Sequence, residues 1–263
     1  MGGASEAQQR DIVLSAMKIL NDMSPEATPP EISFKVHQMV RTLTGNNDPY
    51  QKVKQDATQK ALAMLPRLRT LVEESADPLD AALRLSIAGN IIDFGPNPSY
   101  DLWEEVENAL SQDIAIDDTD LLRDRLAEAE DVLYLADNAG ETVFDRLLIE
   151  VLGKPVTYAV RGGPVLNDAT LEDAIAAGID TIAEVIDNGA RAAGTILSQC
   201  SPAFVDRFMK ADLILSKGMG NYETLSGVVA PIFFLMKVKC PIIGQHVGAL
   251  QGSLIAKIAG SFP

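Results

Sequence analysis

Three loops carry the polar residues whose types and spacing could support metal and phosphate chemistry. The first is Asp137-Asn138-Ala139-Gly140-Glu141, directly after a short apolar run. Carboxylate and amide oxygens are hard ligands that suit Mg²⁺ or Mn²⁺ better than zinc. Gly140 would let the backbone pass close to a ligand. A structural interpretation stays open beside this one, because Asn138 and Glu141 also have the spacing of a helix capping box.

The second loop follows another apolar run and offers Arg161 and Asp168. Asp168 and Asp137 together would supply two negative charges, which match one divalent cation; without a cation they would repel each other. The planar guanidinium of Arg161 suits a phosphate. Alternatively, Asp168 or Thr170 caps the next helix and Arg161 is a solvated surface charge. For Asp168 taken alone, the capping interpretation is favoured.

The third loop is Lys217-Gly218-Met219-Gly220-Asn221, between an apolar segment and a predicted helix. A lysine among glycines at a strand end is similar to a phosphate cradle, because backbone N–H groups and an ammonium group both attract anions. The loop lacks the GxxxxGK[ST] order of a P-loop and the third glycine of a dinucleotide-binding fingerprint. Taken alone, such a loop is a turn more often than a site.

Other candidate residues lie outside these loops. Asn90 and Asp93 are three residues apart near the end of an apolar helix, and therefore share one helical face. A helix C-terminal signal is the favoured interpretation for them. His37 and His246 have no partner at ligand spacing, so that a Ser-His-Asp triad finds no support.

The elements that must position these residues change in character along the chain. Up to about residue 128 the apolar periodicity predicts helices only, and no strong strand precedes residue 131. The predicted helices cover 6–20, 29–44, 50–74 with a kink or break at Pro66, 78–91, 100–111 and 119–130.

From residue 129 onward, short apolar runs alternate with amphipathic helices, which predicts a doubly wound, mostly parallel sheet with right-handed crossovers. The predicted strands cover 132–136, 156–160, 180–186 and 213–216, with one or two more within 229–243. We therefore expect an α/β protein with an all-helical domain over 1–128 and an α/β metal-binding domain over 129–263. Ligands bind at the carboxyl ends of strands in such sheets, so the three loops are placed to share one site.

The composition argues against several classes of partner. The chain has 22 Lys and Arg against 37 Asp and Glu, a net charge of −15. No basic stripe exists to bind a phosphate backbone, so we expect no nucleic-acid partner. The acidic surface disfavours anionic membranes, and the longest apolar run is too short to span a bilayer. Two cysteines without a CxxC spacing and a start without an apolar leader predict a cytoplasmic protein. The oligomeric state stays open.

Five sequence segments follow the tripeptide Asp48-Pro49-Tyr50 along the chain. They are AGNIIDFG (88–95), LADNAGE (135–141), VRGGPVLNDAT (160–170), LSKGMGNYETL (215–225) and LMKVKCP (235–241). Each is weak alone, but together they resemble the damage-control phosphatases, a former domain-of-unknown-function family that is also called acidic-residue-methyltransferase-like. The resemblance covers about residues 45–252. It implies an N-terminal helical bundle joined to a C-terminal Rossmann-like α/β domain.

The resemblance implies a metal-dependent phosphatase for small phosphorylated metabolites, such as sugar phosphates or damaged phosphometabolites, with Mg, Mn, Co or Ni as the metal. The implied metal ligands are Asp137, Asn138 and Asp168. The implied substrate-binding residues are Lys217, Asn90, Arg161, Gly218 and Asn221. The implied catalytic residues are Asp137, Asp93 and Glu141. Attack on phosphorus by a water and attack by a carboxylate such as Asp137 both stay open.

Two rival functions belong to other classes. One is an S-adenosylmethionine-dependent carboxyl methyltransferase, which the family's second name records for some relatives. The other is a non-catalytic phosphometabolite-binding protein that uses the same cleft. A methyltransferase usually has a Gly-rich loop after its first strand, whereas residues 137–140 hold one glycine and two metal-type ligands. We therefore rank the phosphatase first.

Overall fold

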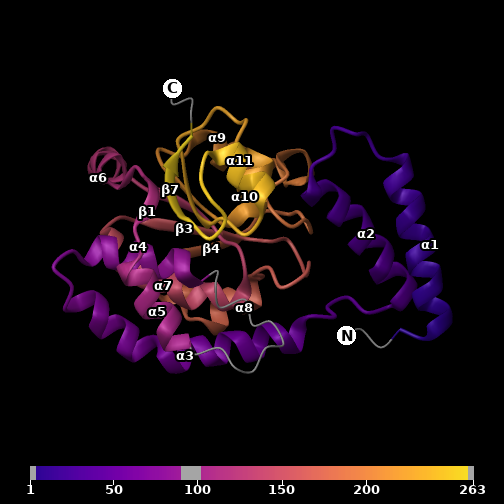
Figure 1. Cartoon of the computed structure of the whole chain (residues 1–263), viewed down its shortest axis with the longest axis horizontal. Coiled ribbons are helices and arrows are strands. Elements are labelled where there is room, and N and C mark those ends of the chain that lie inside the picture. The colour runs from indigo at the N-terminus through magenta and orange to yellow at the C-terminus, as the bar shows by residue number, and fades with distance from the viewer. Residues whose placement is uncertain (1–3, 90–101, 260–263) are drawn as a thin grey trace.

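The computed structural model describes residues 4–89 and 102–259 and confirms the predicted α/β class (Figure 1). The helices are α1 (Glu6–Asp22), α2 (Pro29–Thr44), α3 (Gln51–Glu73), α4 (Pro78–Gly89), α5 (Leu102–Ser111), α6 (Thr119–Glu128), α7 (Thr142–Leu152), α8 (Leu171–Ala176), α9 (Pro202–Lys210), α10 (Gly218–Leu225) and α11 (Pro241–Val247). The strands are β1 (Ile114–Asp117), β2 (Val132–Leu135), β3 (Val156–Val160), β4 (Glu184–Asp187), β5 (Ile214–Lys217), β6 (Ile232–Lys237) and β7 (Leu254–Ile258).

Local signals set several helix boundaries where the sequence predicts them. The capping box at Thr28 and Glu31 starts α2, and Gly45, in the left-handed region with φ 67°, ends it. Of the kink or break expected at Pro66, the break is wrong, because α3 continues through this residue. Met64 and Leu68 are buried on either side of the proline, and their packing offsets the lost backbone hydrogen bond.

The strands form one sheet in the order β1-β7-β6-β5-β2-β3-β4. All neighbouring strands run parallel except β6 and β7. The chain runs outward from β2 through β3 to β4 on one side, and from β5 to β6 on the other. The strand order therefore switches direction between β2 and β5.

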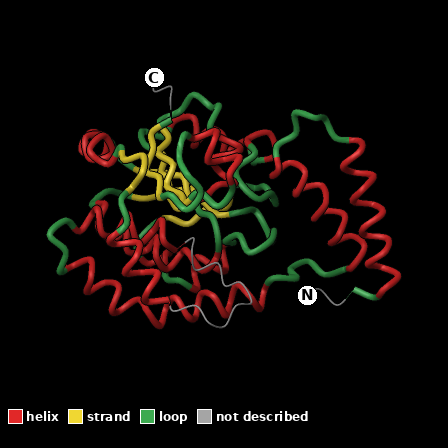
Figure 2. The backbone as a smooth tube through the Cα atoms, in the orientation of Figure 1, coloured by secondary structure: helices red, strands yellow, loops and turns green. Residues whose placement is uncertain are grey.

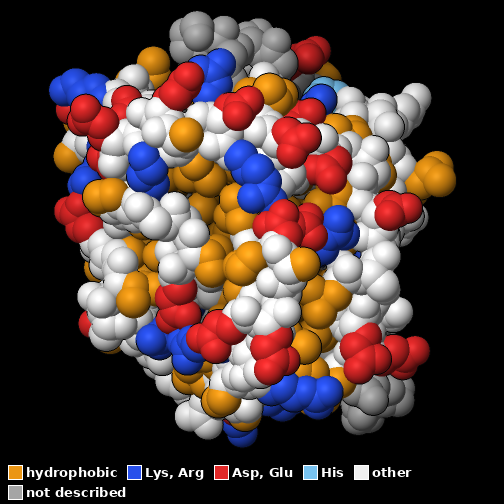
Figure 3. Space-filling model, turned by 90° about the vertical axis from the view of Figure 1, so that its left-hand side faces the viewer, with side chains coloured by type: hydrophobic (Ala, Val, Ile, Leu, Met, Phe, Trp, Pro, Cys, Tyr) orange, Lys and Arg blue, Asp and Glu red, His pale blue; other side chains and the backbone are white. Residues whose placement is uncertain are grey.

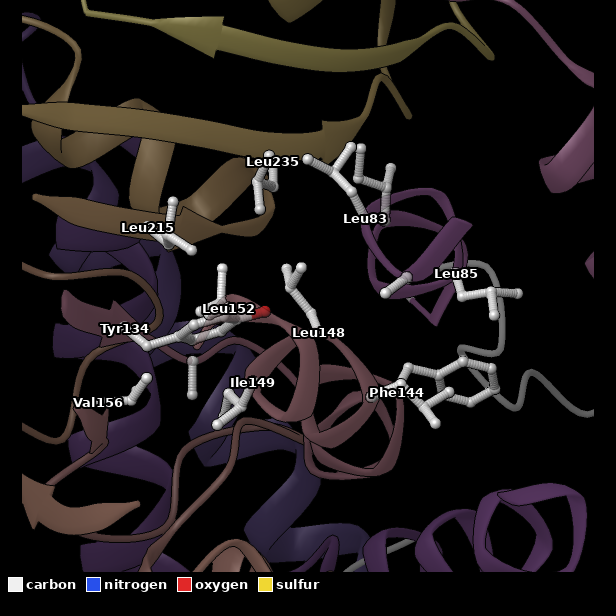
Figure 4. Packing of buried hydrophobic residues seen from close by; sticks show 14 of the residues in the cluster. Leu83, Leu85, Tyr134, Phe144, Leu148, Ile149, Leu152, Val156, Leu215 and Leu235 are labelled. Atoms are coloured by element: carbon white, nitrogen blue, oxygen red, sulfur yellow. The ribbon is translucent and has the colours of Figure 1, made fainter. Parts of the chain in front are cut away.

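Helices cover both faces of this sheet, as a doubly wound fold requires. Alternate strand residues pack on α4 and α7 on one face, with α3 outside them. In the close-up of this face, Tyr134 from β2 and Leu215 from β5 point toward Leu148 and Leu152 of α7 (Figure 4). The opposite face packs on α9, α10 and α11. Because the central strands are buried on both faces, their sequences are mostly apolar.

One expectation about the strands is wrong. Residues 1–128 are not entirely helical, since β1 at 114–117 pairs with β7 at the sheet edge. The stretch 229–243, expected to hold one or two strands, holds one, β6, because Pro241 begins helix α11; the strand β7 lies beyond this stretch and is not among the predicted strands. The division of the chain at residue 128 stays a prediction.

Helices α1 and α2 form a hairpin that stands beside the sheet (Figure 1). Loops lie between the strands and this hairpin (Figure 2). The face in Figure 3 shows acidic and basic side chains interspersed, without a basic stripe. In the described part of the chain, no helix is both long and apolar enough to cross a membrane.

Candidate functional site

The candidate site lies where the strand order switches direction. The loop after β2 carries Asp137 and Asn138, and Lys217 is the last residue of the neighbouring strand β5. The chain leaves these two strands toward opposite sides, so their carboxyl ends border a crevice, the usual ligand position in such sheets. Arg161 directly follows β3, the other neighbour of β2.

A short antiparallel backbone contact joins the first two loops. Asn138 and Asp168 are partners in an isolated β-bridge. Next to them, Ala169 N donates to Asp137 O at 2.8 Å, and Ala139 N donates to Asn167 O at 2.9 Å. These bonds bring together the three expected metal ligands, although some thirty positions separate them in the sequence.

The guanidinium of Arg161 lies between the two aspartates. Its Nε donates to Asp168 Oδ2 at 2.7 Å, and its Nη2 is 3.7 Å from Asp137 Oδ1. Arg161 is only 2% exposed, so a solvated surface arginine is excluded. Nη2 is buried and has no hydrogen-bond partner within the described residues. The capping role considered for Asp168 falls to Thr170, which forms a capping box with Asp173 at α8.

Lys217 is fully buried and contacts two carboxylates. Its Nζ is 2.6 Å from Asp145 Oδ1 and 3.1 Å from Glu141 Oε2. Burial alone would lower the pKa of Lys217, but the two carboxylates raise it above its usual value. The lysine is therefore a charged partner of buried acids, which the sequence did not reveal.

Asp145 is the residue of this cluster that sequence reasoning missed. Besides Lys217, it accepts hydrogen bonds from Ser86 Oγ at 2.9 Å, Tyr134 OH at 2.7 Å and Tyr158 OH at 2.7 Å. The available signal was its position: Asp145 lies four residues after Glu141, as an acid among the apolar residues of a buried helix face.

Asn138 connects the two carboxylates of the first loop. Its Nδ2 donates to Glu141 Oε1 at 2.6 Å and to Asp137 Oδ2 at 3.3 Å. Asn138 is the N-cap residue of the 3₁₀ turn Ala139–Glu141, but its side chain makes no capping hydrogen bond. The capping-box alternative is therefore wrong. Rotating the Asn138 side-chain amide by half a turn would put its oxygen where Nδ2 now lies, facing Asp137 and Glu141.

Gly218 and Asn221 shape the third loop. Gly218 has φ 79°, and an added Cβ would lie 2.0 Å from Asp137 Oδ2, so no other residue fits beneath that carboxylate. The Asn221 amide donates to the backbone oxygens of Ala136 and Lys217 and accepts from Arg161 and Thr195. With these bonds, Asn221 ties together the ends of three strands.

The charge balance of the site is negative. Asp137, Glu141, Asp145 and Asp168 face the buried cations Arg161 and Lys217, and the charge of Lys239 also acts on Asp137 and Glu141. Burial, with Asp168 nearby, raises the pKa of Asp137 to about 6. Burial also raises the pKa of Glu141 to about 8, although Lys217 opposes the shift. Burial likewise raises the pKa of Asp168.

These features fit a divalent cation. Among the described residues, no group of three His, Cys, Asp or Glu has metal-binding geometry. A site here would instead combine the carboxylates of Asp137 and Asp168 with the amide oxygen of Asn138. This donor set consists of hard oxygens, and a divalent cation would offset the negative charges of the two aspartates.

Asn90 and Asp93 fall outside the described residues. His246 Nδ1 lies 2.9 Å from Tyr222 OH, and Cys200 and Cys240 are unpaired and partly buried.

A family model described as the damage-control phosphatase ARMT1-like domain matches residues 2–255. The chain belongs to this family. The damage-control phosphatase resemblance drawn from the five segments is thereby confirmed, and the match also covers the hairpin α1–α2 and β1.

Relatives agree with this assignment. An uncharacterized protein of Methanocaldococcus jannaschii is 37% identical over 94% of this chain and 86% of its own length. Proteins named damage-control phosphatase from Pyrococcus horikoshii and Archaeoglobus fulgidus are 34% and 36% identical over 95% and 92% of this chain, and over 88% and 87% of their own lengths. The crystal structure of a DUF89 family protein from P. horikoshii at 2.04 Å resolution matches with a TM-score of 0.88 and 33% identity, covering 98% of this chain and 92% of that one.

Proposed function

We propose that this protein is a metal-dependent phosphatase that hydrolyses small phosphorylated metabolites. Membership of the damage-control phosphatase family supports the phosphatase activity. The observation that carries the proposal is the buried Nη2 of Arg161, an unsatisfied donor beside Asp137 at the carboxyl edge of the sheet. A buried donor without a partner is costly, and a phosphoryl oxygen is an acceptor that would satisfy it.

Asp137, Asn138 and Asp168 are the residues that would hold the divalent cation, which we expect to be Mg, Mn, Co or Ni. Such a cation, when bound, supplies positive charge that polarises a phosphoryl group and offsets its anionic oxygens. The buried carboxylates of Asp137 and Asp168 repel each other, which helps to raise the pKa of Asp137, and this repulsion supports the proposed metal requirement.

The chain's own groups have separate tasks in this proposal. Arg161 Nη2 binds a phosphoryl oxygen, while the bond from its Nε to Asp168 fixes the plane of the guanidinium. Gly218 leaves space beside Asp137 that a side chain would fill. Glu141 is hydrogen-bonded to Asn138 and Lys217. In this proposal its carboxyl group holds or moves a proton at Oε1 or Oε2.

Two sources of the attacking oxygen are consistent with this arrangement. A water attacks phosphorus in line and yields phosphate directly, or an Asp137 carboxylate oxygen attacks and forms an acyl phosphate that water then hydrolyses. In both cases the bond from phosphorus to the leaving oxygen breaks, and that oxygen takes up a proton. Rapid acid quenching followed by mass spectrometry distinguishes them, because only the second adds a phosphoryl group to Asp137.

The experiment that tests the function is phosphate release by the purified protein across sugar phosphates, nucleotides and phosphopantetheine derivatives. Each substrate is assayed with Mg, Mn, Co or Ni and with a chelator. We expect metal-dependent release that the chelator abolishes. If no metal supports phosphate release, the phosphatase assignment is overturned and the non-catalytic phosphometabolite-binding protein becomes the better hypothesis. Tight binding of S-adenosylmethionine without metal favours the methyltransferase.

A further inference from the structure

A pair of arginines lies near the candidate site but outside it. Arg41 comes from α2, and Arg191 follows β4. Arg41 Nη1 donates to Pro164 O at 3.3 Å. Arg191 lies across Gly163, where an added Cβ would be 2.4 Å from its Nε. Both side chains therefore border the segment that directly follows Arg161.

Within residues 4–89 and 102–259, the pair has no acidic partner. Neither Arg41 nor Arg191 forms an ion pair with a described carboxylate, although acids outnumber bases 37 to 22 in this chain. Burial and the nearby charge of Arg191 lower the pKa of Arg41. Two cations close together without a shared carboxylate create a local positive potential in an acidic protein.

The loop that carries Arg191 is fixed against the loop of the candidate site. Gly162 N donates to Ala190 O at 2.7 Å and to Asn188 Oδ1 at 3.1 Å. An added Cβ on Gly162 would lie 2.4 Å from the backbone of Gly189. The two loops thus pack backbone against backbone, which fixes the backbone that carries the exposed Arg191 relative to that of Arg161.

We propose that Arg41 and Arg191 form a second anion subsite, which binds a phosphate or carboxylate on the part of the substrate that is not hydrolysed. The inference rests on the proposed function, since it takes the reacting phosphate to lie at Asp137 and Arg161. Guanidinium groups bind both kinds of anion through paired hydrogen bonds. The preferred substrates are therefore phosphorylated metabolites with a second anionic group, such as phosphorylated sugar acids or sugar bisphosphates.

The test compares substrates that differ in the second group only. 6-Phosphogluconate carries a carboxylate where sorbitol 6-phosphate has a hydroxymethyl group, and fructose 1,6-bisphosphate adds a phosphate to fructose 6-phosphate. We expect a higher kcat/KM for the doubly anionic member of at least one pair. Arg41→Ala and Arg191→Ala should each reduce this preference roughly tenfold, the usual effect of one charge-assisted hydrogen bond. The pair of compounds in which the doubly anionic member is preferred shows whether the second anion is a carboxylate or a phosphate.

Two further variants separate geometry from charge. Gly163→Ala keeps every charge and has a φ outside the positive range, but its Cβ displaces the Arg191 guanidinium; it should reduce the preference as Arg191→Ala does. Arg10→Ala removes an exposed arginine from α1 and should leave the preference unchanged. Equal use of both members of each pair by the wild type, or an unchanged preference in both arginine variants, overturns the subsite.

Binding keeps this inference distinct from the proposed function. Titration calorimetry with the same four compounds, without metal, requires no turnover. Tighter binding of a doubly anionic compound that Arg41→Ala and Arg191→Ala abolish supports the subsite even if no phosphate is released. Absence of that gain in the wild type overturns the subsite even if the protein is a phosphatase.

Discussion

Two buried cations flank Asp137, and they differ in how fully their hydrogen-bonding capacity is used. Lys217 contacts Glu141 and Asp145 at its single nitrogen. Arg161 has partners on Nε and Nη1 and leaves Nη2 without one among the described side chains. The lysine is thus committed to buried acids, whereas the arginine keeps a donor for a ligand. This comparison favours Arg161 over Lys217 as the main phosphate contact, contrary to the emphasis of the sequence-based expectation.

The supports beneath the two cations differ in the same way. Lys217 is held through Asp145, which also accepts from two tyrosines and a serine of the core. Arg161 is held through Asp168, Thr195 and the Asn221 amide, which are buried beside the candidate metal ligands. Lys217 should therefore matter most for stability, and Arg161 most for turnover.

The largest effect is expected at Asp137, which both cations face. Asp137→Ala removes a proposed metal ligand and should abolish turnover and weaken Mn²⁺ binding; loss of one electrostatic group in such sites typically costs ~10²–10³ in rate. Phosphate release and calorimetric titration with Mn²⁺ measure the two effects. Asp131→Ala, at an exposed position directly before β2, is the matched control. Wild-type turnover in Asp137→Ala would remove Asp137 from the site.

Two substitutions, Lys217→Met and Arg161→Lys, test whether Lys217 mainly supports stability and Arg161 mainly supports turnover. Lys217→Met leaves Glu141 and Asp145 buried without their cation, and should lower the free energy of unfolding by about 3–5 kcal/mol. Arg161→Lys keeps the charge but loses the fork and its free donor. It should lower kcat/KM by ~10²–10³ with a smaller loss of stability. Urea denaturation and initial rates measure both quantities.

The control for the lysine is Lys237→Met, at the partly exposed end of the adjacent strand β6. A surface change of this kind should stay within about 0.5 kcal/mol. Equal stability losses in Lys217→Met and Arg161→Lys, together with equal losses of turnover, would show that the two cations have the same role.

The tyrosines that donate hydrogen bonds to Asp145 test how firmly this carboxylate holds Lys217. Tyr158→Phe removes a donor to the buried Asp145 carboxylate and should lower the free energy of unfolding by about 1.5–3 kcal/mol; Tyr134→Phe should act alike. Tyr222→Phe is the matched control, since its hydroxyl contacts only a partly exposed histidine, and its loss should be nearer 0.5–1 kcal/mol. A smaller loss for Tyr158→Phe than for Tyr222→Phe contradicts the network.

Local patterns predicted most of the fold. Apolar runs of four or five residues, glycine stops and capping signals located β2, β3, β5 and most helices, because these elements are defined by their own residues. The strands β1 and β7 were missed for a non-local reason. β1 is a four-residue strand that ends in an acid and pairs with β7, which is distant in sequence, while β7 pairs with both β1 and β6. The stretch 229–243, expected to hold one or two strands, ends in the first residues of α11.

The residues of the candidate site also divide into those that local patterns predict and those that depend on contacts between distant segments. Asp137, Asn138, Arg161 and Asp168 could be chosen because strand ends meet at one edge of a parallel sheet. The partners of Lys217 could not, because they depend on how α7 packs on the sheet. Tyr134 and Tyr158 were counted as apolar strand residues, yet their hydroxyls reach the carboxylate of the helix packed above them.

The smallest predicted effect concerns the support of Arg161. Thr195 Oγ1 donates to Asn221 Oδ1 at 2.8 Å and accepts from Arg161 Nη1 at 3.3 Å. Thr195→Val keeps the shape but removes both bonds, so the free energy of unfolding should fall by about 0.5–1.5 kcal/mol. Because the guanidinium loses one of its anchors, kcat/KM should fall severalfold while Mn²⁺ affinity stays unchanged. Thr42→Val, exposed on α2, should alter neither. A loss of metal affinity as large as the loss of turnover would instead place Thr195 with the metal ligands, and would remove the distinction between the donor for phosphate and the groups that hold the cation.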